Sequence, residues 1–259
     1  MDLGIEGRTA LICGSSRGLG RACAEALARE GVHVVLNARG REALDATAND
    51  VAKLGRGRVS AVAADLSTED GRKLLLRECP YPDILVANNG GPGTGFLADV
   101  DRETWLETLE ANMVAPLMLI RAVVPNMKER RFGRIVNITS AMVTTPRPHM
   151  VMSAGARAGL TAALKGLSFE LAPFNVTVNN MLPERFDTDR QHRMAQATMK
   201  RENLSYEEAR ARQVQSIAAK RLGDPKEFGA ACAFLCSSFA GYISGQNLHL
   251  DGGSYPALI

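Results

Sequence analysis

The stretch "TALICGSSRGLGRACAEALAREG", residues 9–31, decides the fold class of this chain. Its first residues, 9–13, form a short aliphatic run that is typical of a strand buried on both faces. A glycine-rich turn follows, and residues 19–30 then have the pattern of a helix, for which Gly31 supplies a C-terminal stop. A strand, a tight turn and a helix in direct succession are the first half of a unit that builds parallel sheets.

The rest of the chain repeats this alternation of short aliphatic runs and amphipathic segments. Strand-like runs occupy residues 32–37, 59–64, 83–88, 133–140 and 176–182, and helix-like segments occupy residues 41–53, 101–129 and about 150–171. Strands and helices in alternation, joined by right-handed crossovers, predict an α/β fold with a doubly wound parallel sheet of the Rossmann type. Because 259 residues of even composition suit one such sheet, we expect a single domain over residues 1–259.

The segment 184–218 interrupts the alternation. After Pro183 the sequence becomes charged and rich in amide and methionine side chains. This segment is too irregular to belong to the sheet, and we expect it to cover the substrate in the ligand crevice. Its arginines 185, 190 and 193 offer cations to an acidic substrate, although a solvated helix face is the commoner reason for such charges.

The composition disfavours several classes of function. The net charge is +3, and the 31 basic residues are interleaved with 28 acidic ones, so no basic stripe for nucleic acid or a membrane surface emerges. No window approaches the roughly 20 apolar residues that span a bilayer. The five cysteines are odd in number and include no CxxC pair, which disfavours a disulfide framework and a metal site. We therefore expect a cytoplasmic protein that acts on a small molecule.

The glycines of the first turn suit a phosphate-binding site. Gly14 permits a tight turn, Gly18 lets the backbone approach a pyrophosphate, and Gly20 allows the helix to pack closely. The N-terminus of the following helix offers its unpaired N–H groups to the phosphate charge. Three glycines alone are a weak signal, since a turn without a ligand can have the same composition. Their place in the first strand–helix unit favours a dinucleotide site.

The spacing Gly14-x3-Gly18-x-Gly20 resembles that of the short-chain dehydrogenase/reductase family, in particular its 3-oxoacyl-ACP-reductase-like members. The resemblance continues through "AADL" (63–66), "VANNGG" (86–91), "NNMLPERFDT" (179–188) and "SGQNLHLDGG" (244–253). The cofactor contacts expected from it and from the charge pattern are Gly14, Ser16, Arg17, Gly18, Leu19, Gly20, Arg39, Asp65, Leu66, Asn88, Gly90, Arg157, Pro183 and Thr188. Cys13, Asn89 and Glu184 depart from the family pattern, where threonine, alanine and glycine are usual.

The charge after the second strand distinguishes the two nicotinamide cofactors. NAD-binding proteins usually place a carboxylate there for the ribose hydroxyls, whereas the 2′-phosphate of NADP requires cations. Here the strand ends in "LNARGR", residues 36–41, and no acid precedes Glu42. Arg39 is positioned to form two parallel hydrogen bonds to the 2′-phosphate, and Arg17 can reach the same group from the glycine turn. Exposed arginines often have no ligand, but this pair favours NADP(H) over NAD(H).

The segment "SAMVTTPRPHMVMSAGARAG", residues 140–159, departs from the family at its catalytic centre. Family members carry a serine, twelve residues, a tyrosine, three residues and a lysine, and here that spacing leads from Ser140 to Ser153 and Arg157. The resemblance also implies Asn112 in the active site. The tyrosine protonates the alkoxide that hydride transfer leaves, after the lysine lowers its pKa, and a serine hydroxyl is a far weaker acid. Arg157 preserves the positive charge of the family lysine. That charge can bind the nicotinamide ribose and stabilise the negative charge that develops on the carbonyl oxygen.

His149 is a candidate for the missing acid. If the helix begins near Pro148, His149 precedes Ser153 by one turn and lies on the same face, and imidazole titrates in the useful range. A single histidine after "PRP" is more often a surface or loop residue. Both interpretations stay open at this point.

Three functions are consistent with these residues. The first is an NADP(H)-dependent oxidoreductase that interconverts a small carbonyl and an alcohol, with an atypical active site. The second is an NADP(H)-binding sensor or non-catalytic subunit with little turnover, and a less favoured third is an isomerase or dehydratase that uses a bound nucleotide. The small residues between Gly155 and Gly166 permit close helix contacts, either within the chain or across the interface of a homodimer or homotetramer such as the family forms.

Overall fold

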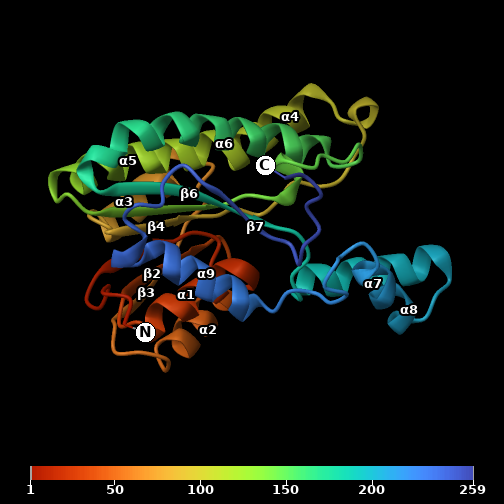
Figure 1. Cartoon of the computed structure of the whole chain (residues 1–259), viewed down its shortest axis with the longest axis horizontal. Coiled ribbons are helices and arrows are strands. Elements are labelled where there is room, and N and C mark those ends of the chain that lie inside the picture. The colour runs from red at the N-terminus through yellow and green to blue at the C-terminus, as the bar shows by residue number, and fades with distance from the viewer. Residues whose placement is uncertain (1, 259) are drawn as a thin grey trace.

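The computed structural model describes residues 2–258 and has a seven-stranded sheet at its centre (Figure 1). The strands are β1 (Thr9–Ile12), β2 (His33–Ala38), β3 (Val59–Ala63), β4 (Ile84–Ala87), β5 (Gly133–Ile138), β6 (Val176–Pro183) and β7 (Asn247–Leu250). All neighbours pair in parallel, in the order β3-β2-β1-β4-β5-β6-β7. The predicted doubly wound parallel sheet is therefore confirmed. The strand order reverses between β1 and β4, which is where such sheets bind ligands.

The helices form a layer on each side of the sheet. They are α1 (Gly18–Arg29), α2 (Arg41–Val51), α3 (Glu69–Glu78), α4 (Arg102–Leu109), α5 (Ala115–Glu129), α6 (Val151–Leu171), α7 (Asp189–Glu202), α8 (Tyr206–Val214) and α9 (Pro225–Cys236). In Figure 1, α1, α2 and α9 lie below the sheet and α5 and α6 above it. α3 belongs to the same layer as α5 and α6, because its Leu75 is buried in one cluster with Val123 and Leu160. Neighbouring residues of β1 point into opposite layers, since Ile12 packs with Leu27 and Phe228, whereas Leu11 packs with Val123.

Six of the seven strands (β1–β6) and five of the helices (α1, α2, α4, α5 and α6) overlap the segments that the sequence predicts, whereas β7, α3 and α9 have no counterpart in that prediction. The start of α9 nevertheless carries a readable signal, because Asp224 and Glu227 form a capping box around Pro225 at the first helical turn. Ser205 and Glu208 form a second capping box at the start of α8. The irregular segment 184–218 thus contains two helices.

A continuous helix runs from Arg102 to Glu129, with a π-helical turn over Glu110–Val114 between α4 and α5. By length and composition it is apolar enough to cross a membrane, so the expectation that no stretch approaches this is wrong. In the structure this helix is a layer of the core, because Leu119, Val123 and Met127 are buried against the sheet. Core helices of globular proteins pass the same compositional test.

The helices α7 and α8 form a lobe that projects from the end of the sheet where β6 finishes (Figure 1). A hydrogen bond joins the two helices, because the Nε2 atom of Gln213 in α8 donates to the carbonyl oxygen of Gln191 in α7 at 2.9 Å. The side chain of Arg185, after β6, donates to the hydroxyl of Ser216 at 2.8 Å and so ties the end of the lobe to the body. Few apolar contacts anchor this lobe, and Gln191 and Ala195 are the buried residues of α7.

Candidate active site

The glycine turn between β1 and α1 is a close-packed unit. Gly14 and Gly18 both have φ of +58°, which glycine adopts without steric cost. A β-carbon on Gly20 would lie 2.3 Å from the carbonyl oxygen of Gly14 and 2.9 Å from Nδ2 of Asn88. Asn88, directly after β4, donates to that same carbonyl oxygen at 3.3 Å. The turn therefore needs glycine at the positions that the sequence assigned to phosphate binding.

The N-terminus of α1 is open to an anion. Arg17 occupies the cap position, but its side chain makes no capping hydrogen bond and the first turn contains no acidic residue. The N–H groups of this turn, which have no partner within the helix, face the cleft without a side chain to accept them. Behind the turn, Ser15 accepts the N–H of Asn37 at 3.0 Å and Thr47 donates to the carbonyl oxygen of Ser16 at 2.8 Å. These bonds fix the turn against β2 and α2.

Arg17 and Arg39 are exposed, and their side chains make no hydrogen bond or ion pair within the described range 2–258. They follow β1 and β2, which are neighbours in the sheet. The pKa of the Asp65 carboxyl is lowered, mainly because it accepts the Ser67 hydroxyl at 2.7 Å, and the charge of Arg39 adds to this effect. The ends of β1, β2 and β3 thus present two cations without hydrogen-bond or ion-pair partners among the residues that the structure describes, and one carboxylate that already accepts hydrogen bonds from Ser67.

The remaining residues expected to contact the cofactor lie around the same crevice. Leu19 is in α1, Leu66 follows β3, Gly90 follows β4, and Pro183 ends β6. The neighbouring residue Asn89, which departs from the family pattern, donates through Nδ2 to the carbonyl oxygen of Ala111 at 2.7 Å. Asn88 and Asn89 therefore connect the glycine turn to the π-helical turn that carries Asn112.

Arg157 is the centre of a second cluster, at the carboxyl end of β5. Its Nη1 atom donates to the carbonyl oxygens of Ile138 at 3.1 Å and Thr139 at 2.7 Å, and its Nη2 atom donates to Oδ1 of Asn112 at 3.3 Å. Asn112 is buried in the π-helical turn, where its own Nδ2 donates to the carbonyl oxygen of Thr108. Such turns often mark functional sites. The structure thus brings together Asn112 and Arg157, as the family resemblance implies.

The guanidinium of Arg157 is a buried charge without an acidic partner in the described part of the chain. The residue is 8% exposed, and its Nε atom has no hydrogen-bond acceptor among the described residues. Burial is the main reason that its pKa falls to about 10, and the nearby charge of Arg190 lowers the pKa further. The group stays protonated at neutral pH. An unbalanced buried cation costs stability, which is typical of a site arranged for a ligand.

Ser140 and Ser153 come from the two elements that Arg157 joins, the end of β5 and α6. Ser140 follows β5 directly after Thr139, and its hydroxyl accepts the N–H of Met142 at 3.2 Å. Ser153 lies in α6 one turn before Arg157, is 4% exposed, and forms no side-chain hydrogen bond to any residue between 2 and 258. The four residues expected at the catalytic centre are therefore grouped around the end of β5, and none of the side chains is a phenol.

His149 is not placed as the sequence suggested. α6 begins at Val151, so the premise that the helix starts near Pro148 is wrong. The residues before α6 form a turn instead, in which the carbonyl oxygen of His149 accepts the N–H of Gly95 at 2.9 Å. The imidazole is exposed and lies edge-on to Phe96, with ring centroids 6.4 Å apart. This long-range pairing with residue 95, rather than the helix, fixes the position of His149.

The first turn of α7 brings a second guanidinium to Arg157. A β-carbon on Gly91 would lie 2.8 Å from Nη1 of Arg190 and 3.5 Å from Nη2 of Arg157, so both side chains pass beside this glycine. Thr188, the cap residue of α7, approaches the glycine turn, because its methyl group lies 3.9 Å from the β-carbon position of Gly18. Gly91 was not among the expected site residues, and its lack of a side chain is what leaves room for Arg190.

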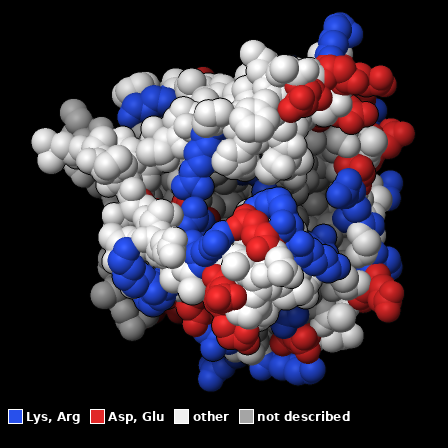
Figure 2. Space-filling view, turned by 90° about the vertical axis from the view of Figure 1, so that its right-hand side faces the viewer, with Lys and Arg blue, Asp and Glu red and all other residues white. Residues whose placement is uncertain are grey.

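Two further cations beside the lobe share one acidic partner. Arg185 lies 3.4 Å from a carboxylate oxygen of Glu184, and Arg147 lies 2.9 Å from the same oxygen. Glu184, which replaces the glycine of the family pattern, thereby joins the loop after β5 to the loop after β6. Figure 2 views the molecule from the side of this lobe and shows Lys and Arg side chains around a hollow in the surface.

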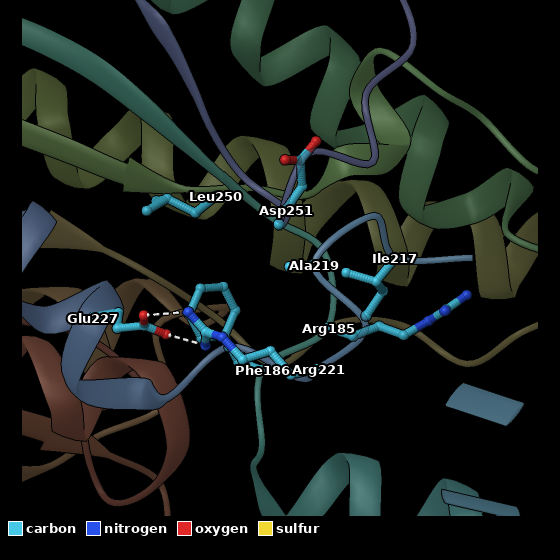
Figure 3. A pocket seen from close by; sticks show the side chains of 10 residues that line it. Arg185, Phe186, Ile217, Ala219, Arg221, Glu227, Leu250 and Asp251 are labelled. Atoms are coloured by element: carbon cyan, nitrogen blue, oxygen red, sulfur yellow. Dashed lines mark hydrogen bonds and ion pairs between the residues drawn. The ribbon is translucent and has the colours of Figure 1, made fainter. Parts of the chain in front are cut away.

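A separate small pocket lies where the lobe meets β7 and α9 (Figure 3). It is lined by Arg185, Phe186, Ile217, Ala219, Arg221, Gly223, Glu227, Leu250, Asp251 and Gly252. Arg221 forms two hydrogen bonds to the carboxylate of Glu227, at 2.8 and 2.7 Å, and this pairing lowers the pKa of Glu227 to about 2. The cations of this pocket are already balanced, and none of the residues expected at the catalytic centre lines it.

The chain is similar to a family of known reductases along nearly its whole length. A model of the enoyl-(acyl carrier protein) reductase family matches residues 14–255. The 3-oxoacyl-[acyl-carrier-protein] reductase FabG of Vibrio cholerae serotype O1 is 34% identical over 253 residues, which cover 98% of this chain and 99% of that protein. The NADPH-dependent reductase BacG of Bacillus subtilis is 32% identical over 256 residues, which cover 97% and 99%.

Solved structures with the same fold include enzymes with bound cofactor. L-sorbose reductase from Gluconobacter frateurii, complexed with NADPH and L-sorbose, superposes with a TM-score of 0.96 at 30% identity and covers all of both chains. YwfH, an NADPH-dependent reductase involved in bacilysin biosynthesis, superposes with a TM-score of 0.91 at 31% identity and covers 98% of this chain and 100% of its own.

Proposed function

Because this chain belongs to the short-chain dehydrogenase/reductase family, we propose that it is an NADP(H)-dependent oxidoreductase that interconverts a small carbonyl compound and an alcohol. The observation that carries the proposal is the uncapped N-terminus of α1, joined through Asn88 and Asn89 to the cluster of Asn112 and Arg157. The first feature suits the pyrophosphate of a dinucleotide, and the second suits its ribose and reactive ring. Relatives named as NADPH-dependent reductases support the choice of cofactor.

The residues of the chain fit this cofactor and divide the work of the reaction. The nicotinamide, when bound, supplies a hydride to the carbonyl carbon, and a proton must then reach the carbonyl oxygen. Arg157 holds the ribose and keeps a positive charge near the oxygen on which negative charge develops. Asn112 and the carbonyl oxygens after β5 hold Arg157 in place. Ser140 and Ser153 face the substrate, and neither hydroxyl gives up a proton readily, so protonation limits the rate.

The preference for NADPH over NADH is expected to depend on Arg39 and Arg17. Arg39→Ala should weaken NADPH binding by about 5- to 150-fold, because a charge-assisted contact to the 2′-phosphate contributes roughly 1–3 kcal/mol. Arg17→Ala should act in the same direction, and neither variant should change the affinity for NADH. Calorimetric titration with both nucleotides measures this, and Arg41→Ala is the matched control because Arg41 is paired with Asp45 at 2.8 Å. Equal affinity of the parent protein for the two nucleotides would contradict the assignment.

A role for His149 as the proton donor predicts a specific pH profile. A donor imidazole must be protonated, so the rate of reduction should fall as the pH is raised from acidic to alkaline values. His149→Asn should abolish this limb of the profile and leave NADPH binding intact. Stopped-flow measurement of NADPH oxidation across this pH range tests it. Because His149 is exposed beside Phe96, we expect the variant to fold as the parent does, and an unchanged profile excludes His149 as the acid.

The alternative is an NADP(H)-binding sensor or non-catalytic subunit with little turnover. Ser153 is the observation that favours it, because a buried serine stands at the position where the family has its acid. An isomerase or dehydratase that uses a bound nucleotide is a third, less favoured function. Steady-state oxidation of NADPH against a panel of carbonyl compounds separates the first two. Tight NADPH binding without turnover of any compound would show that this chain is a binding protein and not an oxidoreductase.

We propose that residues 184–218 are the substrate cover of a single domain spanning residues 1–259. The contacts of Thr188 and Arg190 support this role, because they place the start of α7 over the glycine turn and over Gly91. The small-molecule substrate would enter between this lobe and the end of β5. The five cysteines are all buried and free of disulfides, which suits the reducing cytoplasm in which we expect the protein to act.

We propose a homodimer or homotetramer that uses the outer face of α5 and α6. Gly155 and Gly159 serve packing within the chain, since β-carbons there would lie 3.2 Å from Trp105 and 3.0 Å from Met113. Gly166 instead faces open space. Beside it, a largely apolar groove between the two helices is lined by Leu117, Met118, Ile120, Arg121, Val124, Pro125, Lys128, Ala163, Leu167 and Glu170. A face of this kind is suited to a second copy of the chain.

A further inference from the structure

The cleft beside β5 holds two cations and no acid that balances them within residues 2–258. Arg157 donates to one amide oxygen and two carbonyl oxygens, all of them uncharged. Arg190 makes no hydrogen bond or ion pair with any of these described residues. Arg157 is buried and Arg190 is exposed, so water screens their mutual repulsion only on the side of Arg190. The pair therefore destabilises the empty cleft and is stabilised when an anion lies between the two groups.

Other arginines of the α7–α8 lobe, unlike Arg190, have acidic partners. Arg210 pairs with Asp187 at 2.6 Å, and Arg212 pairs with Glu202. Asp189 precedes Arg190 directly in the sequence and still does not pair with it. Acidic side chains are thus available along α7, and the fold leaves this one guanidinium directed at the cleft and at Gly91.

The orientation of the start of α7 separates the cofactor side of the cleft from the substrate side. Thr188 faces the glycine turn, where the pyrophosphate is expected, with its methyl group 3.9 Å from the β-carbon position of Gly18. Arg190 lies two residues later and reaches Gly91, next to Arg157. Arg157 contacts Asn112 and the end of β5, where the carbonyl group of a substrate reacts. An anion held by both arginines is therefore adjacent to the reacting carbonyl.

We propose that the substrate is a short oxo acid whose carboxylate lies between Arg190 and Arg157. This inference rests on the proposed function, since the oxo group is the carbonyl that is reduced. The hydride goes from NADPH to the carbonyl carbon and a proton from solvent or a side chain goes to the oxygen, which gives a hydroxy acid and NADP⁺. The guanidinium of Arg190 has all its N–H donors available in a planar fork that matches the two oxygens of a carboxylate.

The test uses oxamate, an unreactive carboxylate that imitates a short oxo acid, and its neutral analogue oxamide. Calorimetry measures the binding of each to the full chain saturated with NADPH, in a buffer low in chloride. We expect oxamate to bind and Arg190→Gln to weaken it by 10-fold or more, while Arg190→Lys gives an intermediate loss because it keeps the charge without the fork. Lys226→Gln, which removes one exposed positive charge on α9, should leave oxamate binding unchanged.

Two results would overturn the inference. If the parent protein with NADPH does not bind oxamate, or binds oxamide equally well, the cleft does not select a carboxylate. If Arg190→Gln instead weakens NADPH itself, Arg190 belongs to the cofactor site. Both results are independent of turnover, because oxamate is not reduced. Failure of the proposed oxidoreductase function would appear separately, as oxamate binding that depends on Arg190 in a protein that reduces no oxo acid or neutral ketone.

Discussion

Changing Ser153 to tyrosine together with Arg157 to lysine is expected to raise the single-turnover rate of ketone reduction by about 10²–10⁴, the contribution typical of a positioned general acid. The spacing of the two positions supports this result, because Ser153 and Arg157 lie one turn apart on α6 and Arg157 already reaches the end of β5. A phenol at position 153 would have a cation one turn away to lower its pKa. Stopped-flow oxidation of NADPH with a generic ketone measures the rate, after calorimetry has shown that the cofactor still binds.

The matched control is Ser153→Phe with Arg157→Lys, which adds the same ring without the hydroxyl. It should stay at the rate of the parent, and each single change should give less than the pair, because a lysine without a phenol has no acid to tune. Ser153 is 4% exposed, so the new ring must displace its neighbours, and overpacking of this kind costs about 1–3 kcal/mol. A folded, NADPH-binding double variant that is no faster than its phenylalanine control shows that the missing tyrosine does not limit this protein.

The pH dependence of the double variant follows from the same burial. Desolvation and the charge of Arg190 lower the pKa of Arg157 to about 10, and both disfavour a charge on a lysine placed there. The lysine should therefore lose its proton at a lower pH than a free lysine does. Because the neutral amine no longer lowers the pKa of the phenol, the gain in rate should shrink as the pH rises into the alkaline range. Rates of the double variant relative to the parent, measured across pH 6–10, report this loss.

Gly20→Ala is expected to weaken NADPH binding by about 5- to 150-fold, which corresponds to the 1–3 kcal/mol that overpacking typically costs. The added methyl group would lie 2.3 Å from the carbonyl oxygen of Gly14 and 2.9 Å from Asn88, and the first of these is backbone that cannot rotate away. The start of α1 must then move from the turn, which separates its N–H groups from the pyrophosphate. Calorimetry gives the affinity, and a thermal melt gives the accompanying loss of stability.

Gly40→Ala is the matched control for this prediction. A β-carbon on Gly40 meets no atom within 4 Å, and its φ of −85° suits alanine, so affinity and stability should stay close to those of the parent. If Gly20→Ala binds NADPH as tightly as Gly40→Ala does, the glycine turn does not hold the pyrophosphate. A loss in both variants would instead point to a general sensitivity of the α1–α2 region.

The sequence patterns predicted the sheet because each strand is a short continuous segment that is buried on both faces of the sheet. The short aliphatic runs at 9–13, 83–88 and 133–140 correspond to β1, β4 and β5, since strands that meet a helix layer on each side are mostly apolar, although β5 also buries Arg134 and Asn137. β7 escaped prediction, because an edge strand of four residues with an exposed start has no continuous apolar run. The starts of α8 and α9 were readable in principle from their capping boxes, which are patterns of four adjacent residues.

The sequence by itself determined the fold class, the glycine turn and the exchange of tyrosine and lysine for Ser153 and Arg157, because each depends on neighbours or fixed spacing along the chain. Only the tertiary structure decided which cation of the segment 184–218 reaches the cleft. Arg185 is tied to Glu184, while Arg190 lies beside Gly91, about a hundred residues away in sequence. The start of α6 was likewise set by pairing with a distant loop. Contacts of this kind form only when separate segments are packed together, and local propensity does not encode them.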